Sequence, residues 1–298
     1  MDAASVKELH IESSSRCNAR CSSCGRSDFG REVWPSIVIQ DLDPSRLLEV
    51  LDMFPNLTDI QFCGNAGDPI AAKNVIEHMG IAVEKALRND CMIQIQTNGS
   101  LRSRAWWRNL AEVLAPVKHE VLFALDGLED THHIYRQGTS FAKVIENAKS
   151  FISAGGTAVW QFIPFKHNQH QILDCLRMSQ NLGFRRFLLI KMARVPERTW
   201  DVKSRSFIHL SPWDRDRDVN PDRSPAREIK DQVLPEHCFH LQQSSVFLNV
   251  DGTISSCCHQ GLHRRSSNVT ELPDVVSEFS NNPHIICLEK CGSRANIG

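Results

Sequence analysis

Short apolar stretches alternate with helical patterns along roughly the first 190 residues of the chain. Strands are predicted at Lys7–Glu12, Asp59–Cys63, Met92–Thr97, Glu120–Leu125, Ala158–Pro164 and Arg186–Lys191. Helices are predicted between them, at Pro44–Met53, Ile70–Leu87, Ser103–Leu114, Phe141–Ala154 and Gln169–Leu182. Such alternation indicates an α/β fold in which helices cover a parallel sheet. Six strand–helix units are two fewer than a closed barrel of eight, so the pattern predicts a partial (β/α)₆ barrel of the TIM type.

The pattern changes after residue 195. Residues 196–236 are interpreted as a connector, because Arg198–Lys230 is rich in Arg, Asp, Ser and Pro and poor in aliphatic side chains. The charge run Asp214–Asp218 inside it is expected to be a solvated surface. We therefore expect a barrel domain (1–195), this connector and a small C-terminal domain (237–298).

The C-terminal part has a pattern of its own. A β-hairpin is predicted from Ser245–Val250, a turn at Asp251 and Gly252, and Thr253–Cys257. A modest helical stretch, Pro273–Phe279, follows. This part is expected to form a small unit of one hairpin and one helix.

Composition narrows the class of protein. The 298 residues are 41% hydrophobic and 23% charged, which is ordinary for a soluble globular protein. A formal net charge of −1 argues against a broad electrostatic grip on nucleic acid or on anionic lipid. No apolar run approaches the about 20 residues of a membrane span, and Met1–Glu12 lacks the features of a signal peptide. We expect a cytoplasmic protein that binds neither nucleic acid nor membrane.

The chain holds eleven cysteines, and most of them fall into two groups. Without an export signal, so many cysteines indicate a reducing compartment and metal or catalytic roles before disulfides. The first group is Cys17, Cys21 and Cys24, and the second is Cys238, Cys257, Cys258, Cys287 and Cys291. Two separate groups predict two metal sites.

The first group has the spacing CxxxCxxC and follows the first predicted strand directly. Three thiolates on one loop can hold three irons of a [4Fe–4S] cube and leave the fourth iron without a protein ligand. An open iron is a place for chemistry, much as an open position marks a catalytic zinc. A zinc loop is the alternative, although zinc sites prefer CxxC pairs and this loop offers one pair and an outlier.

Polar motifs follow the other predicted strands. In strand order they are Cys63–Pro69, Thr97–Gly99, Ala124–Gly127, Pro164–Asn168 and Lys191–Arg194. In a barrel of this kind, active residues lie on the loops that follow the strands, at one end of the barrel. Each motif alone could be an ordinary turn. Their common placement predicts that they meet the cysteine loop around one site.

The cysteine loop and these motifs resemble the radical S-adenosylmethionine (SAM) superfamily. The resemblance implies that SAM chelates the open iron and that the reduced cluster cleaves SAM to a 5′-deoxyadenosyl radical. The run from Gly64 to Pro69 resembles the superfamily's Gly-Gly-Glu motif, whose backbone carbonyls bind the SAM ammonium, so Gly64, Gly67 and Asp68 are expected at SAM. Asp68 stands where Glu is usual, so a backbone role is expected more than a carboxylate role.

Three further residues are expected at SAM through the same resemblance. Asn98 matches a motif at the end of the third strand. Asp126 lies in Ala124–Gly127, which resembles a Ser-x-Asp-Gly motif, although Ala124 replaces the serine. Arg136 is a candidate partner for the SAM carboxylate, since a guanidinium pairs bidentately with a carboxylate. A surface ion pair is the alternative for Arg136.

The second cysteine group resembles the auxiliary-cluster (SPASM/twitch) domain of the superfamily. Cys238 is followed by thirteen residues, Gly252, four residues and Cys257, like the C-x(9–15)-G-x(4)-C opening of that domain. Two further candidate ligands, Cys287 and Cys291, lie downstream, so the count fits the shorter twitch form with one auxiliary [4Fe–4S] cluster. A Cys₄ zinc site is the alternative. The resemblance thus implies two [4Fe–4S] clusters and SAM as cofactors.

Cys258 is left over beside a proposed ligand, because two adjacent residues rarely both ligate one cluster. In some epimerases of the superfamily a non-ligand cysteine donates a hydrogen atom, and the organisation of this chain resembles the neomycin-type aminoglycoside epimerases. Cys258 is therefore the predicted catalytic hydrogen donor; a small buried residue is the alternative. Cys63 is the next candidate donor. His132, His133 and His259 are candidates for acid–base roles.

The first functional hypothesis is epimerisation of a carbon centre in a sugar-type natural product, such as an oligosaccharide or aminoglycoside. An electron donor such as flavodoxin or ferredoxin would be the partner. The second is a dehydrogenase that oxidises a sugar or cyclitol alcohol through the auxiliary cluster. The third is peptide modification, weakened because no segment is typical of a leader-peptide binding module. The fourth, a non-catalytic zinc or electron-transfer protein, leaves the open three-cysteine loop unexplained.

Overall fold

An eight-stranded sheet forms the centre of the computed structural model, which describes residues 2–190, 198–201, 203–211, 244–256, 266, 268–271 and 273–274. Its strand order is β10-β9-β1-β2-β3-β4-β5-β6. The strands are β1 (Glu8–Glu12), β2 (Asp59–Cys63), β3 (Met92–Thr97), β4 (His119–Ala124), β5 (Ala158–Phe162), β6 (Arg186–Leu189), β9 (Ser245–Leu248) and β10 (Ile254–Ser255). All neighbouring pairs are parallel except β9 and β10. The predicted α/β fold with a partial barrel is confirmed.

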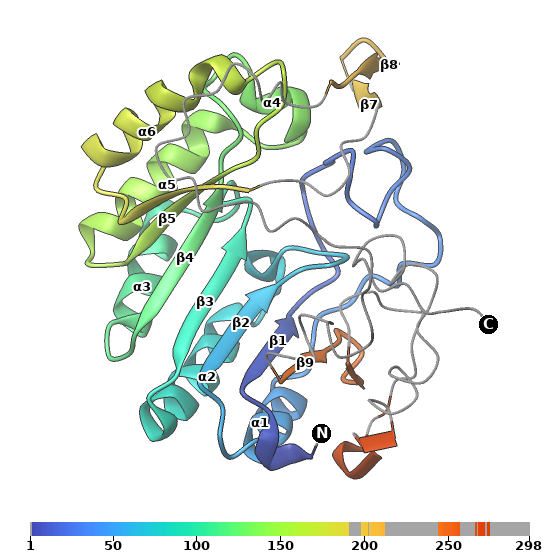
Figure 1. The fold of residues 1–298 in the computed structure, drawn as a ribbon, viewed down its shortest axis with the longest axis vertical. Coiled ribbons are helices and arrows are strands. Elements are labelled where there is room, and N and C mark those ends of the chain that lie inside the picture. Colours follow the sequence, from blue (N-terminus) through green and yellow to red (C-terminus); the bar gives the residue numbers. More distant parts are fainter. Residues whose placement is uncertain are drawn as a thin grey trace, which may run out of the picture.

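The helices follow the strands in the predicted order. They are α1 (Pro44–Met53), α2 (Val75–Asn89), α3 (Arg104–Leu114), α4 (His132–Tyr135), α5 (Phe141–Ser153) and α6 (Ile172–Asn181). The longer ones lie along one face of the sheet (Figure 1). Two of them begin later than predicted, because short 3-10 turns at Pro69–Ala71 and Gln169–Gln171 precede α2 and α6.

Alternation along the strands sorts side chains between the two faces of the sheet. In β3, Ile93 and Ile95 are fully buried, and they pack with helix residues such as Trp107 into one hydrophobic core. Gln94 and Gln96, which alternate with them, are only partly buried. Because successive strand side chains point to opposite faces, Gln96 and its counterpart Cys63 in β2 face away from the helices.

Side-chain caps fix the starts of two helices. Asp43 accepts a hydrogen bond from Ser45 N at 2.8 Å before α1, whose first residue is Pro44. Ser103 Oγ accepts one from Trp106 N at 3.2 Å before α3. Each cap satisfies a backbone donor that the first helical turn leaves without a partner. The predicted bounds of both helices agree with these caps to within one residue.

The predicted C-terminal hairpin is confirmed, and it belongs to the same sheet as the barrel strands. β9 pairs in parallel with β1, with Ser245 opposite Glu8, and β10 runs antiparallel to β9. Ser245 Oγ donates to Glu8 Oε2 at 2.8 Å, and the rings of His10 and Phe247 stack 4.5 Å apart. Gly252 in the turn has a φ of 80°, a conformation that favours glycine. The sequence predicted the hairpin but not its place beside β1.

A second hairpin lies inside the predicted connector. β7 (Arg198–Asp201) and β8 (Ser206–His209) pair antiparallel and form a separate two-stranded sheet. Sequence analysis missed it because both strands are short and poor in aliphatic side chains. The charge run Asp214–Asp218 and all but the first two residues of the predicted helix Pro273–Phe279 lie outside the described residues. None of the helices in the described part of the chain is long and apolar enough to cross a membrane.

Candidate active site

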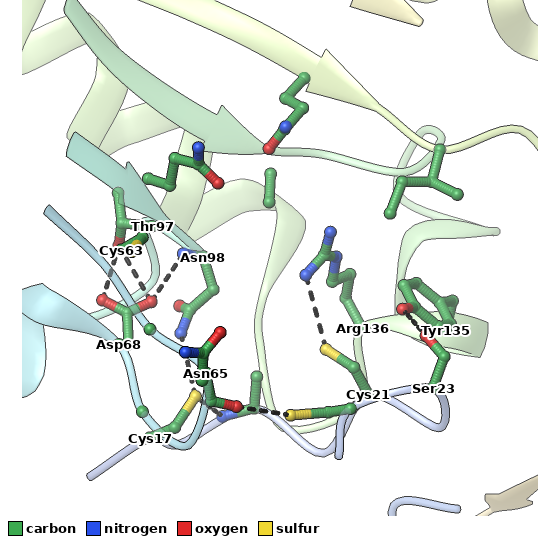
Figure 2. A pocket seen from close by; sticks show the side chains of 18 of the residues that line it. Cys17, Cys21, Ser23, Cys63, Asn65, Asp68, Thr97, Asn98, Tyr135 and Arg136 are labelled. Atoms are coloured by element: carbon green, nitrogen blue, oxygen red, sulfur yellow. Dashed lines mark hydrogen bonds between the residues drawn. The ribbon is translucent and has the colours of Figure 1, made fainter. Parts of the chain in front are cut away.

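A cavity of about 410 Å³ lies where the parallel strands end (Figure 2). Its walls come from the cysteine loop (Cys17, Ala19, Cys21, Ser23, Cys24, Gly25), the loop after β2 (Cys63, Gly64, Asn65, Gly67, Asp68), the end of β3 (Gln96, Thr97, Asn98), and Ala124, Tyr135, Arg136, Gln161 and Ile163. The motifs after β2, β3 and β4 therefore meet the cysteine loop, as predicted. The motif Pro164–Asn168 does not line the cavity, and Lys191–Arg194 lies outside the described residues.

Hydrogen bonds to backbone carbonyls hold the cysteine loop against the turn that follows α4. Arg20 N donates to Gln137 O at 2.7 Å, and Asn18 Nδ2 donates to Gly138 O at 3.0 Å. Gly138 has a φ of 80°, and a Cβ there would lie 2.4 Å from Asn18 O. Only glycine allows this close approach. The loop is thus fixed by the backbone of Arg20 and the side chain of Asn18, and its three cysteines line the cavity.

The thiols of the loop suit an iron–sulfur cluster. Burial raises the pKa of Cys17 to about 12 and raises that of Cys21 as well. A buried thiolate needs a positive charge beside it, which the irons of a bound cluster supply. Three soft thiolates at one cavity fit a cluster in which each cysteine binds a different iron. Among the described residues, no three His, Cys, Asp or Glu side chains are grouped as ligands of a single metal ion.

The loop after β2 packs backbone against backbone. A Cβ on Gly64 would lie 1.9 Å from Gly67 O, and a Cβ on Gly67 would lie 1.8 Å from Ser14 O. Asp68 N donates to Arg16 O at 2.8 Å and ties this loop to the segment after β1. Gly67 is therefore needed for the close approach of this loop to the segment after β1, and Gly64 for the tight fold of the loop itself. Both needs come in addition to the predicted backbone contact with SAM.

The carboxylate of Asp68 joins the ends of β2 and β3. It is buried and accepts hydrogen bonds from Thr97 Oγ1 at 2.9 Å, Asn98 N at 2.7 Å and Ile70 N at 3.0 Å. Asn98, held in this way, directs its side-chain amide into the cavity, where Nδ2 lies 3.7 Å from Cys17 Sγ. Sequence analysis missed this role, because it expected the backbone of Asp68 to matter more than the carboxylate.

Asp126 and Arg136 form a buried ion pair instead of the surface pair considered from sequence. Arg136 Nε lies 2.6 Å from Asp126 Oδ2, and the two side chains are 14% and 0% exposed. Ile163 N donates to the other carboxylate oxygen at 2.6 Å, and Arg136 Nη1 donates to Cys21 Sγ at 3.5 Å (Figure 2). Burial opposes the charge of Arg136, but Asp126 and Cys21 outweigh it and raise the pKa of the guanidinium further. Asp126 does not line the cavity, so it lies behind Arg136.

His132 has a structural role. Burial lowers its pKa to about 3, so the imidazole is neutral. Nδ1 accepts a hydrogen bond from Asp126 N at 3.2 Å, and Nε2 lies 2.9 Å from Thr139 Oγ1. The ring therefore supports the turn that carries Asp126. Of the other acid–base candidates, His133 does not line the cavity and His259 lies outside the described residues.

Sequence analysis missed several residues of the cavity wall. Gln96 and Gln161 reach it from the strand positions that face away from the helices, and Tyr135 reaches it from α4 with its hydroxyl bonded to Ser23 Oγ. Strand alternation could have found the two glutamines, since each lies between buried neighbours. Cys63, the second candidate hydrogen donor, also lines the cavity.

The second cysteine group lies outside the described residues. This concerns the predicted auxiliary ligands and the predicted hydrogen donor, namely Cys238, Cys257, Cys258, Cys287 and Cys291. The auxiliary cluster and the donor stay predictions.

Fold and cavity together define an α/β-barrel protein with a three-cysteine site at the carboxyl ends of its strands. The family model described as the radical SAM superfamily matches residues 11–178, more than half of the chain, and the chain belongs to this superfamily. Membership supports an enzyme that uses SAM and a [4Fe–4S] cluster.

The chain is also similar to a named relative and to solved structures. A relative from Pyrococcus furiosus, described as a tungsten-containing aldehyde ferredoxin oxidoreductase cofactor-modifying protein, is 26% identical over 219 residues. The match covers 70% of this chain and 58% of the relative, so the chain spans less than two thirds of that relative's length. The structure of Streptococcus suis SuiB bound to SAM matches with a TM-score of 0.63 and 14% identity, over 96% of this chain and 68% of SuiB. Native anSMEcpe with bound SAM matches with a TM-score of 0.58 and 17% identity, over 92% and 80%. Both structures share the fold.

Proposed function

We propose that this chain removes a hydrogen atom from a substrate carbon by radical SAM chemistry and epimerises that carbon. The observation that carries the proposal is the single cavity that Cys17, Cys21 and Cys24 share with the loop after β2, Asn98 and Arg136. When bound, the [4Fe–4S] cluster and SAM supply the 5′-deoxyadenosyl radical that takes the hydrogen. The three cysteines hold one iron each.

The cavity wall provides partners for both charged groups of the SAM methionine. The loop from Gly64 to Asp68 offers backbone carbonyls to the ammonium, and Arg136 offers its guanidinium to the carboxylate. Asn98 lies on the same side as Asp68, across the cavity from Arg136 (Figure 2). Exclusion of water strengthens such interactions. These groups would orient SAM against the cluster.

Epimerisation also needs a hydrogen atom for the opposite face of the carbon, and Cys258 is the proposed donor. Its S–H bond breaks, the hydrogen joins the substrate carbon, and the sulfur is left as a thiyl radical. One electron from a reduced flavodoxin or ferredoxin and one proton restore the thiol. In this proposal Cys238, Cys257, Cys287 and Cys291 would hold an auxiliary [4Fe–4S] cluster, which would supply electron-transfer chemistry beside the adjacent residue Cys258 in the sequence.

Cys63 is the alternative donor, and the described structure bears on it directly. It lines the cavity, and burial raises its pKa to about 12, so it keeps its S–H bond near neutral pH. Gln96 and Gln161 line the same cavity. Neutral amides both donate and accept hydrogen bonds, so they suit the hydroxyl and amide groups of a sugar-type substrate.

Anaerobic turnover in D₂O tests this proposal, because an exchangeable thiol donates deuterium there. Candidate oligosaccharide, aminoglycoside and peptide substrates are incubated with wild type, Cys258→Ala and Cys63→Ala, and the products are analysed by mass spectrometry. We expect a product one deuterium heavier from wild type and Cys63→Ala, and none from Cys258→Ala. If Cys63→Ala alone fails to form the product that is one deuterium heavier, the donor is Cys63 in the cavity and not Cys258.

Two results would overturn parts of the proposal. A product two hydrogens lighter, formed equally by Cys258→Ala, would exclude epimerisation and favour dehydrogenation through the auxiliary cluster. Absence of 5′-deoxyadenosine from a fully cluster-loaded protein, with every substrate class, would refute the radical reaction itself.

A further inference from the structure

The sulfur of one of the three cluster cysteines accepts a hydrogen bond from a charged side chain. Arg136 Nη1 donates to the sulfur of the buried Cys21 at 3.5 Å. The hydrogen bonds to Cys17 Sγ come from neutral groups, Ala19 N at 3.3 Å and Asn98 Nδ2 at 3.7 Å. Within the described residues, Cys21 is thus the loop cysteine whose sulfur accepts a hydrogen bond from an ionised side chain.

Arg136 is held in this position from behind. Its Nε lies 2.6 Å from Asp126 Oδ2, and its guanidinium carbon lies 5.1 Å from the centre of the Tyr135 ring. Asp126 is fixed in turn, because Ile163 N donates to Oδ1 at 2.6 Å and Asn168 Nδ2 donates to the Asp126 carbonyl at 3.2 Å. A fully buried carboxylate therefore sets the direction of the guanidinium toward the sulfur.

We propose that Arg136 is a positioning residue that raises the reduction potential of the cluster through Cys21. Asp126 sets the size of this effect, because it both holds the guanidinium and offsets its charge. The inference rests on the proposed function, since it requires a [4Fe–4S] cluster on Cys21.

One-electron reduction adds a negative charge to the cluster, and hydrogen bonds to the ligand sulfurs stabilise the reduced state. A charge-assisted hydrogen bond is stronger than a neutral one. Burial keeps water from screening it, so the effect of Arg136 on the reduced cluster is larger than it would be at the surface.

Other roles for the ion pair predict different results. If the Arg136–Asp126 ion pair has only a structural role, its replacement leaves the reduction potential of a loaded cluster unchanged. A guanidinium that serves only the SAM carboxylate alters SAM binding and leaves the potential of the SAM-free protein unchanged. The potential is therefore measured before SAM or substrate is added.

The experiment is a redox titration of the anaerobically reconstituted full chain, followed by electron paramagnetic resonance. It compares wild type with Arg136→Gln, Asp126→Asn and Arg186→Gln. Arg186 is the matched control, because it pairs with Glu120 within the same sheet and has no described hydrogen bond to a loop cysteine. A variant that lacks all three loop cysteines supplies the auxiliary-cluster signal for subtraction. Iron and sulfide contents establish equal loading.

In Arg136→Gln we expect the equilibrium constant for one-electron reduction to fall about tenfold, which corresponds to a potential lower by about 59 mV. Asp126→Asn keeps a side-chain oxygen that can accept hydrogen bonds but loses the offsetting charge, so its potential moves upward. Arg186→Gln stays at the wild-type value. Opposite shifts in the two partners of one ion pair would not arise from a loss of structure.

An unchanged potential in a loaded Arg136→Gln protein, or an equal shift in Arg186→Gln, would overturn the inference. If Arg136→Gln does not load its cluster, Asp126→Asn decides, and the lack of an upward shift refutes it. Failure of wild type to bind a cluster at the loop would instead refute the proposed function. A loaded wild type that does not cleave SAM would also refute that function and leave the measured potentials valid.

Discussion

Replacement of Gly67 by alanine tests the packing of the two loops that form the floor of the cavity. The added Cβ would lie 1.8 Å from Ser14 O, 2.6 Å from Ser14 C and 2.8 Å from Ser15 Cα, where real Cβ contacts are never below 3.0 Å. All three are backbone atoms, so no side chain can rotate away. The loop after β2 has to move by more than about 1 Å from the segment after β1.

The structure indicates what this movement costs. It breaks the hydrogen bond from Asp68 N to Arg16 O at 2.8 Å and the one from Ala66 N to Glu12 Oε1 at 2.6 Å. A neutral hydrogen bond contributes about 1 kcal/mol and one to a charged group about 1.5–3 kcal/mol, while overpacking costs about 1–3 kcal/mol. Since part of each contact re-forms, we expect the free energy of unfolding to fall by about 3–5 kcal/mol. That is a large share of the roughly 5–15 kcal/mol of a typical domain.

Anaerobic thermal unfolding of the full chain measures this effect. At about 2–4 °C per kcal/mol for a chain of this size, the Tm of Gly67→Ala is expected to fall by roughly 6–20 °C. Gly25→Ala is the matched control: Gly25 lies in the same cavity wall, and a Cβ there meets nothing within 4 Å. A Gly67→Ala protein that unfolds together with wild type and Gly25→Ala would show that the two loops are not in close contact.

Three further outcomes are expected. Serine at any one of the three loop cysteines abolishes SAM cleavage, measured as 5′-deoxyadenosine, and lowers the iron content of the protein. Cys175→Ser, at a buried cysteine outside the cavity, retains SAM cleavage and the wild-type iron content. His132 is kept neutral by burial, with its pKa lowered from 6.5 to about 3, so the unfolded chain binds more protons below pH 6.5 and stability falls as the pH drops toward 3. Through this group alone, stability is about 2 kcal/mol lower at pH 5 than at pH 7, and urea unfolding of His132→Gln should lack that part of the pH dependence. Trp107→Ala, at a fully buried ring, costs about 3–5 kcal/mol in the same assay, and Trp106→Ala, at a partly exposed one, costs less.

The strands and the place of the site could be predicted because both follow from local pattern and general geometry. β2 and β3 lie at their predicted bounds, since each combines strict alternation of buried and partly exposed residues with flanking turn residues. Parallel strands end at one edge, so polar motifs after them had to meet there. The cysteine spacing then indicated the chemistry.

The roles of individual carboxylates could not be predicted in this way. Asp68 and Asp126 were both expected at SAM, and each is buried and accepts a hydrogen bond from the backbone N–H group of a residue that directly follows another strand, namely Asn98 after β3 and Ile163 after β5. These partners are 30 and 37 residues away in the sequence. Tertiary packing determines these hydrogen-bond partners, so a local sequence pattern does not predict them. The place of β9 beside β1 is non-local for the same reason.

This strand pairing also governs how the chain is assembled on the ribosome. Ser245 and Glu8 are 237 residues apart, and synthesis at 5–20 residues per second separates their emergence by roughly 12–48 s. During this interval β1, which leads into the cysteine loop, can pair only with β2, and its other edge is open to strands of neighbouring nascent chains. Translation speed and the supply of chaperones therefore bear on the yield of soluble protein, and a chain that stops before residue 245 is expected to collect in inclusion bodies.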